Sequence, residues 1–303
     1  MATAIPSAAN EALRSSWKTC RTRSSRAARA SASGVDRLPG ATTAWDTPQR
    51  IHSSTRVAQN VAATPAVSLE GCIVPIVSPV RVDVWSDVVC PWCFIGKRRF
   101  DRAVEILQEK GVTETIQVVY RAYQLDPTAP IGEPTPVPDA YAKKFGGRER
   151  AEQILAHVTG IAASEGIEFR MHDALRANTT LAHRALRWAL AVAPGSGPDA
   201  QARLKESLLS AYFTEGRDVG DPDTIAACAD RAGLDGATLR GWLDGDGGTV
   251  EVVADLRAAI DREITGVPAF VIDDAFLVPG AQDTDTFVNV IERILARRAD
   301  AAR

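Results

Sequence analysis

Apolar and polar positions begin to alternate regularly near residue 80. Residues 80–85 place apolar side chains at nearly every second position, which predicts a strand. Apolar residues between Phe100 and Leu107 follow helical spacing, and Gly111 is a suitable place for that helix to end. Residues 115–120 are rich in β-branched side chains and predict a second strand. The strand–helix–strand order predicts a parallel pair joined by a crossover helix.

Helical patterns fill the middle of the chain. A proline-rich loop over residues 127–138 marks a boundary, and residues 139–262 are predicted to be helical throughout. Asp221 followed by Pro222 is typical of a helix start, with an acid at the cap and proline in the first turn. Two apolar stripes at helical spacing predict further helices, one made by Leu204, Leu208, Ala211 and Tyr212 and the other by Val252, Val253, Leu256, Ala259 and Ile260.

The pattern changes again near the end of the chain. Residues 269–272 and 275–278 are short apolar runs, and Asp273-Asp274 between them suits the tight turn of a hairpin. A last amphipathic helix follows, with Phe287 and Ile291 on its apolar face. These elements predict an α/β protein with the order β-α-β, a helical insertion, then β-β-α, built as one sheet with helices on both faces. The expected divisions are residues 80–137, an inserted helical domain over residues 138–262, and residues 263–303.

Composition limits the classes of partner. The 303 residues are 45% hydrophobic and 24% charged, as in ordinary globular proteins. No apolar run approaches the roughly 20 residues that a membrane span needs. Residues 1–79 carry nine basic and four acidic residues, whereas the rest of the chain carries 26 and 34. An acidic main body argues against a nucleic-acid surface, so we expect neither nucleic acid nor membrane as a partner.

The first 60 residues have a different character. They are rich in Ser, Thr, Ala and Arg and show neither a helix nor a strand period. Such a segment buries too little apolar surface to offset its ordering entropy. We interpret residues 1–79 as a disordered or targeting-like extension. The Arg- and Ser-rich residues 1–60 resemble an organelle transit peptide, but a disordered extension or an upstream start codon is the simpler explanation. Without a secretory signal, the expected compartment is the cytoplasm.

The candidate chemistry lies at Cys90-Pro-Trp-Cys93, the one close pair among five cysteines. Half of a zinc site needs a second Cys or His pair, and the four histidines show no ligand spacing with this one, so no metal is expected. A structural disulfide usually bridges longer loops and occurs in sets. A redox dithiol needs a strand before it and a helix starting at it, and this context is present. The sequence therefore favours a redox-active pair.

The position of the pair assigns a role to each thiol. Cys90 falls at a helix N-terminus, where unpaired N–H groups and the helix dipole favour an anion, and Pro91 in the first turn loses little by lacking its N–H. Spacing of three places both sulfurs on one side of the turn. We expect Cys90 to be exposed, with a pKa below the free value of about 8.5, and Cys93 to resolve the mixed disulfide. Trp92 is either an apolar platform at the rim or packing against the helical insertion.

A second element precedes the first strand of the hairpin. X–Pro bonds are cis in only about 5–6% of folded cases, so frequency alone predicts a trans bond between Val267 and Pro268. A cis bond would instead expose the Val267 backbone near the dithiol, where it can pair with an extended substrate segment.

Several motifs occur together and in a fixed order, namely Trp85-Ser-Asp-Val-Val-Cys-Pro-Trp-Cys-Phe-Ile-Gly-Lys97, Gln124-Leu-Asp-Pro127, Asn178-Thr179, Gly266-Val-Pro268 and Val278-Pro-Gly-Ala-Gln282. With them the chain resembles the DsbA family of thioredoxin-fold oxidoreductases, and within it the FrnE-like subgroup. The resemblance covers about residues 80–298.

This resemblance implies a thioredoxin fold with an inserted all-helical domain. It also implies a cis bond at Val267–Pro268, against the frequency argument, and active-site support from Pro91, Trp92, Val267 and Pro268. Exchange would run through a mixed disulfide at Cys90, released by attack of Cys93.

Related families leave an alternative function open. The 2-hydroxychromene-2-carboxylate isomerases and kappa-class glutathione transferases share this layout but typically carry serine where this chain has Cys90. A glutathione-dependent isomerase or transferase is therefore the alternative, with glutathione as a candidate co-substrate. Gln282 and Asp283 open the last helix and are candidates to meet an anionic group, although an ordinary helix cap is the preferred interpretation. Asn178 is a third substrate-binding candidate and equally a common cap.

The sequence thus predicts a cytoplasmic thiol–disulfide oxidoreductase that acts on disulfide-containing proteins or small thiols. The expected direction is reduction or isomerisation more often than net oxidation. Beyond the dithiol no cofactor is expected, and a homodimer is compatible with the sequence.

Overall fold

The computed structural model describes residues 78–301 and 303, which belong to one compact unit. The predicted extension over residues 1–79, with Cys20, Cys72 and the targeting-like residues 1–60, lies outside the described residues except for Ser78 and Pro79. Within the described part of the chain, no helix is long and apolar enough to cross a membrane.

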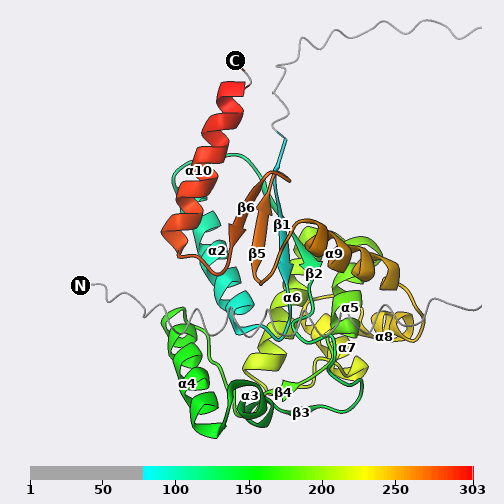
Figure 1. The fold of residues 1–303 in the computed structure, drawn as a ribbon. Coiled ribbons are helices and arrows are strands. Elements are labelled where there is room, and N and C mark those ends of the chain that lie inside the picture. The colour runs from blue at the N-terminus through cyan, green and yellow to red at the C-terminus, as the bar shows by residue number, and fades with distance from the viewer. Residues whose placement is uncertain (1–77, 302) are drawn as a thin grey trace, which may run out of the picture. The chain divides into compact units, whose positions relative to one another are not determined.

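The main sheet has four strands in the spatial order β2-β1-β5-β6: β1 (Val80–Ser86), β2 (Ile116–Ala122), β5 (Ala269–Ile272) and β6 (Phe276–Pro279) (Figure 1). β1 pairs in parallel with β2 and antiparallel with β5, and β5 pairs antiparallel with β6. Helix α2 (Pro91–Glu109) connects the parallel pair. The predicted β-α-β and β-β-α order is confirmed, and it is the α/β thioredoxin arrangement.

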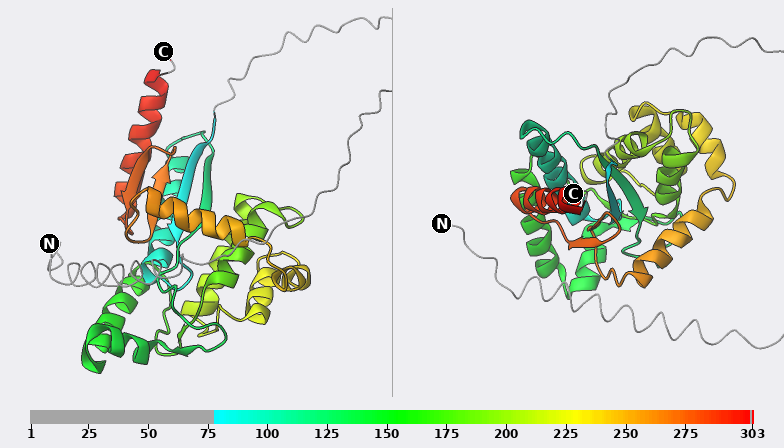
Figure 2. Two further views of the ribbon diagram at one scale, coloured as in Figure 1. Left: turned by 45° about the vertical axis from the view of Figure 1, so that its right-hand side comes forward. Right: turned by 90° about the horizontal axis from the view of Figure 1, so that it is seen from above.

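Side chains of β1 alternate between two layers, as the pleat of a strand requires. Val82 and Val84 face α2 and the last helix, α10 (Thr284–Ala301), which lie together on one side of the sheet (Figure 2). Trp85 faces the other side, where its indole N–H donates to the backbone carbonyl of Asp255 on α9 (Thr249–Asp261).

Three phenylalanines fill the layer between the sheet and these two helices. Phe100 of α2, Phe270 of β5 and Phe287 of α10 are buried, with ring centroids 4.7–5.2 Å apart. We call these three residues the aromatic layer. Aromatic pairs in this arrangement add roughly 0.5–1.5 kcal/mol each beyond the burial of apolar area.

The insertion between β2 and β5 is mostly helical: α3 (Val137–Phe145), α4 (Arg148–Ser164), α5 (Thr180–Ala191), α6 (Pro198–Phe213), α7 (Pro222–Arg231), α8 (Gly236–Leu243) and α9. The prediction of an all-helical insertion is wrong in one detail. Two short strands, β3 (Thr135–Pro136) and β4 (Leu175–Arg176), form an antiparallel ladder, with β3 just before α3 and β4 between α4 and α5. Two residues on each strand give no run long enough for an alternating pattern, which is why the sequence does not show them.

Local signals placed several boundaries correctly. Asp221 caps α7, where its carboxylate accepts from the backbone N–H of Thr224 at 2.9 Å. Asp273 and Asp274 both adopt positive φ angles, 51° and 58°, in the turn between β5 and β6. Asp tolerates this left-handed region better than most residues, so the acidic pair allows the tight hairpin.

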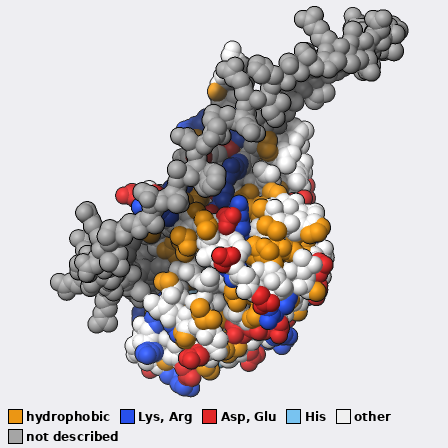
Figure 3. Space-filling model, turned by 90° about the vertical axis from the view of Figure 1, so that its right-hand side faces the viewer, with side chains coloured by type: hydrophobic (Ala, Val, Ile, Leu, Met, Phe, Trp, Pro, Cys, Tyr) orange, Lys and Arg blue, Asp and Glu red, His pale blue; other side chains and the backbone are white. Residues whose placement is uncertain are grey.

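The stripe predicted on α9 is only partly buried. Val252 and Ala259 are buried, but Val253 and Ile260 are exposed, together with Val250. Figure 3 views this side of the molecule and shows apolar side chains gathered on its surface. Only a narrow face of α9 contacts the sheet. The prediction that Val253 and Ile260 share the buried apolar stripe was therefore wrong.

The outer edge of β2 is covered by side chains of the insertion. The buried amide of Gln201 on α6 accepts from the backbone N–H of Tyr120 at 2.8 Å and donates to its carbonyl at 2.9 Å. Asp255 on α9 accepts from the backbone N–H of Ala122 at 3.1 Å. These two side chains occupy the places where the backbone of a further strand would bind.

Candidate active site

Cys90 and Cys93 occupy the opening turn of α2, as the sequence predicts. Cys90 is the N-cap residue with an extended backbone, Pro91 is the first helical residue, and the Cys93 N–H donates to the Cys90 carbonyl at 3.0 Å. Both thiols are free. Proline at the first helical position keeps φ suitable for a helix without removing a needed donor, so this short sequence fixes where the helix begins.

The start of β5 brings a second chain segment against Cys90. The Val267–Pro268 bond is cis, so the frequency argument for a trans bond was wrong and the expectation from the family resemblance is confirmed. The Cys90 thiol donates to the backbone carbonyl of Val267, with 3.6 Å between sulfur and oxygen. Val267 and Pro268 therefore lie beside the dithiol.

Gly96 allows α2 to approach this segment closely. A Cβ atom at Gly96 would lie 2.9 Å from Cγ of Pro268 and 3.2 Å from Cβ of Ala281. Any larger residue would push the helix away from the proline. Sequence reasoning missed this role, because a helical glycine gives no sign of which distant residue it accommodates.

Both sulfurs are covered, which corrects the expectation of an exposed Cys90. Cys90 is 3% exposed and Cys93 is 2% exposed. They belong to a small apolar cluster with Trp85, Ile264 and Val267, and Trp92 packs partly buried against it. Part of the cover comes from Ile264 and Val267, more than 160 positions further along the chain, and no local pattern around Cys90 indicates it.

Trp92 packs inside the protein on two sides. It is partly buried, and it packs against the apolar core of the helical insertion as well as against the cluster around the dithiol. Packing against the insertion is therefore confirmed, while a platform role toward a partner stays a prediction.

Burial also changes the acidity of the pair. It raises the pKa of Cys90 well above its ordinary value, and the neighbouring Cys93 adds to the rise. The prediction of a lowered pKa for Cys90 was therefore wrong, because loss of solvent outweighs the helix terminus. Burial acts in the same sense on Cys93, but the adjacent Cys90 thiol, the Lys205 ammonium, the Ser86 hydroxyl and the backbone of Asp87 together outweigh it and lower the pKa of Cys93. The anion of the reduced pair is thus favoured on Cys93.

Asp87 and Lys205 are buried and act electrostatically on the dithiol, and the buried His183 contacts Asp87; we call these three residues the charged cluster. Asp87 is fully buried, and its carboxylate accepts from the backbone N–H groups of Val88 and Leu125, both at 2.8 Å. Nε2 of His183 lies 3.2 Å from the same carboxylate and 3.1 Å from the carbonyl of Tyr123. Because both neighbours are acceptors, Nε2 carries the proton.

In the sequence, Asp87 stands out only as part of a motif, and Lys205 gives no signal of its own. Lys205 comes from α6, more than 110 residues after the dithiol, and its pKa is lowered by burial although Cys93 and Asp87 act against this. A lysine between predicted core positions is easily taken for a residue at the edge of the apolar face.

The three substrate-binding candidates all make local structural contacts. The Asn178 amide donates to the Ala129 carbonyl at 2.8 Å and accepts from the Thr180 N–H at 3.0 Å, next to the start of α5. Asp283 accepts from the Thr286 N–H at 2.7 Å, the contact of a helix cap. That N–H lowers the pKa of Asp283. Gln282 donates to the Pro279 carbonyl at 2.6 Å. Their roles toward a substrate or glutathione stay predictions.

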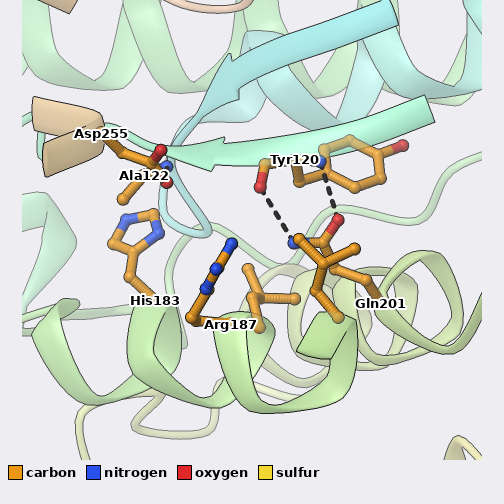
Figure 4. A pocket seen from close by; sticks show the side chains of 8 residues that line it. Tyr120, Ala122, His183, Arg187, Gln201 and Asp255 are labelled. Carbon is orange, nitrogen blue, oxygen red and sulfur yellow. Dashed lines mark hydrogen bonds between the residues drawn. The ribbon is translucent and has the colours of Figure 1, made fainter. Parts of the chain in front are cut away.

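A small cavity lies between β2, α5, α6 and α9, away from the two sulfurs. Its walls include Tyr120, Ala122, His183, Arg187, Gln201 and Asp255, and its volume is about 10 Å³ (Figure 4). One water molecule needs at least roughly 10–15 Å³ measured in this way. The cavity is therefore too small for a substrate and is not the reaction site.

Comparison with known proteins agrees with this geometry. The DSBA-like thioredoxin domain model matches residues 81–292. The chain is 28% identical over 214 residues to YwbO, an uncharacterised protein of Bacillus subtilis (strain 168), which covers 70% of this chain and 96% of YwbO.

Two solved structures are similar in fold. A probable DsbA oxidoreductase from Streptomyces coelicolor is 31% identical, with a TM-score of 0.64 over 72% of this chain and 90% of that chain. A putative protein disulfide isomerase from Nitrosomonas europaea is 16% identical, with a TM-score of 0.54 over 73% and 99%. The latter likeness shows the fold alone, and the FrnE-like subgroup stays a prediction. Because the domain model spans well over half of the residues, the chain belongs to the DsbA-like thioredoxin-domain family.

Proposed function

We propose that this protein is a thiol–disulfide oxidoreductase that acts on disulfides of proteins or small molecules. One observation carries the proposal. Two free thiols one helical turn apart stand at the N-terminus of α2, with the Val267 carbonyl against the first of them. A zinc half-site or a structural bridge does not need this placement.

The reaction begins at Cys90, which occupies the cap position ahead of the helix. As a substrate disulfide approaches, the Cys90 sulfur attacks one of its sulfurs, a Cys90–substrate disulfide forms, and the other substrate sulfur leaves as a thiolate. The Cys90 proton has an acceptor at hand, because the reduced pair favours its anion on Cys93. Cys93 then attacks the Cys90 sulfur, the enzyme becomes an intramolecular disulfide, and the substrate leaves as a second thiol. The two electrons go from the dithiol to the substrate.

In the cytoplasm, the compartment expected from the sequence, thiols are kept reduced. We infer a reductant or isomerase, re-reduced by a small thiol of the glutathione class. A cytoplasmic location and a homodimer are compatible with this role and stay predictions.

Insulin reduction with a thiol donor tests the proposal. Wild type should accelerate precipitation of the insulin chains, and Cys90→Ser should lose at least about 100-fold in rate, since the attacking sulfur is gone. Cys93→Ser should accumulate a mixed disulfide that mass spectrometry detects. Cys228→Ser is the matched control, because Cys228 is a third buried thiol, packed in the helical core. Equal activity in wild type and Cys90→Ser would refute the proposal.

A further inference from the structure

Lys205 is an unusual residue for the interior of a protein. Its side chain is fully buried, and its Nζ has no hydrogen-bond partner among the described residues. The ring of Tyr120 faces Nζ, with its centroid 5.7 Å away. Burying an ammonium group costs several kcal/mol unless other charges compensate it. Such a cost suggests that the positive charge serves the chemistry.

The charges around Lys205 point toward the dithiol. Cys93 and Cys90 from α2, and Asp87 just before α2, all attract its positive charge, whereas Lys97 of α2 repels it. Lys97 is itself neutralised by Asp101 at 2.7 Å and Glu206 at 2.8 Å. The ring of Tyr120 on β2 also faces the Lys205 ammonium. Glu206, the next residue on α6, binds Lys97 at 2.8 Å and Arg98 at 2.7 Å, so this part of α6 lies against α2 just after Cys93. Lys205 itself binds no carboxylate of the described residues.

The positive charge of Lys205 is most important in the second step of the reaction. In the reduced pair, the Cys90 thiol, Lys205, the Ser86 hydroxyl and the backbone of Asp87 all favour Cys93 as an anion. Once Cys90 is part of a mixed disulfide, its S–H no longer exists. Of the remaining groups Lys205 is the one that carries a positive charge, at the moment when Cys93 must be a thiolate to attack.

We propose that Lys205 is a positioning residue for the resolution step, in which its ammonium stabilises the Cys93 thiolate that attacks the Cys90–substrate disulfide. In this step the Cys93–Cys90 S–S bond forms and the Cys90–substrate S–S bond breaks. The departing substrate thiolate takes the electron pair and the proton that Cys93 gives up on ionising, so the substrate leaves as a thiol. No further oxidant or reductant is needed. The proposal rests on the function proposed above and concerns its second half.

Reaction of the reduced protein with the disulfide of thionitrobenzoate separates the two halves. Attack by Cys90 releases one coloured thiolate, and resolution by Cys93 releases the second, so stopped-flow absorbance follows both phases. We expect Lys205→Met to slow the second phase about 10-fold at pH 7, equivalent to one unit in the pKa of Cys93. The rate should recover at high pH, where Cys93 ionises without help. Lys97→Met removes a cation that is already neutralised and should change the second phase less than about twofold.

The outcomes distinguish the two proposals. A second phase in Lys205→Met with unchanged rate and pH midpoint overturns the role of Lys205, and so does a slowing that is equal at every pH, because that marks a purely structural effect. If Lys205→Met does not fold, the wild-type profile decides. A midpoint of the second phase at or above about 8.5 means that no charge favours the thiolate. Failure of the proposed function looks different, because the first phase is then absent or persists in Cys90→Ser.

Discussion

The aromatic layer and the charged cluster are both buried, but they are held by different kinds of contact. Phe100, Phe270 and Phe287 contact one another and need only apolar neighbours of the right volume. The charged cluster depends on particular partners, as Asp87 does on two backbone N–H groups and His183. Apolar burial stabilises the fold, whereas buried charges are costly to it. We therefore expect the aromatic layer to determine stability and the charged cluster to influence the thiol chemistry. Mutations in the two groups should then have different effects.

The largest expected effect lies in the aromatic layer. Phe287→Ala should lower the free energy of unfolding by about 3–5 kcal/mol, because it removes a fully buried ring and leaves a cavity. Urea unfolding measures this change. Leu277→Ala is the control, since Leu277 on β6 is 48% exposed and should change stability by less than about 0.5 kcal/mol. Thiol kinetics of the molecules that remain folded should stay within about twofold, and a larger loss would show that the layers are not separate.

A smaller effect of opposite sign is expected in the charged cluster. Lys205→Met should raise the free energy of unfolding by about 1–2 kcal/mol at pH 7, because it replaces a buried cation by an apolar chain of similar length. The pKa of Lys205 is lowered in the folded protein, so the unfolded chain binds more protons between the folded and unfolded pKa values. Wild-type stability therefore rises with pH in that window, toward about 10.5, and the gain from the substitution shrinks. Urea unfolding at pH 7 and pH 9.5 checks both statements, and a destabilised variant would contradict them.

The smallest effect concerns Asp283, which tests whether the start of α10 binds substrate. Asp283→Ala should cost about 0.5–1 kcal/mol, the value of a helix cap, and leave KM for a thiol donor unchanged. Thr286→Ala is the matched control, since it keeps the backbone N–H that Asp283 accepts. A clear rise of KM for glutathione in Asp283→Ala alone would support the binding role instead.

The sequence predicted what local signals determine. Pro91 after Cys90 located the start of α2, and Asp273-Asp274 located the hairpin. The burial of Cys90 was not predictable in this way, because Val267 covers it from 177 positions away. The same holds for the acidity of the pair, which burial and Lys205 decide. The cis bond at Val267–Pro268 followed from resemblance to a family and not from the residues themselves. Lys205 went unnoticed because its burial depends on β2 and α2, far away in the chain.

Gln201 limits where a further strand could join the sheet. Its amide offers one acceptor and one donor to Tyr120, as a neighbouring peptide group would, and Asp255 occupies the next free donor. An incoming strand would have to displace both groups to join at β2. Recruitment of foreign chains is thereby blocked at one border of the sheet, and a self-associating assembly built by strand addition would have to extend from β6.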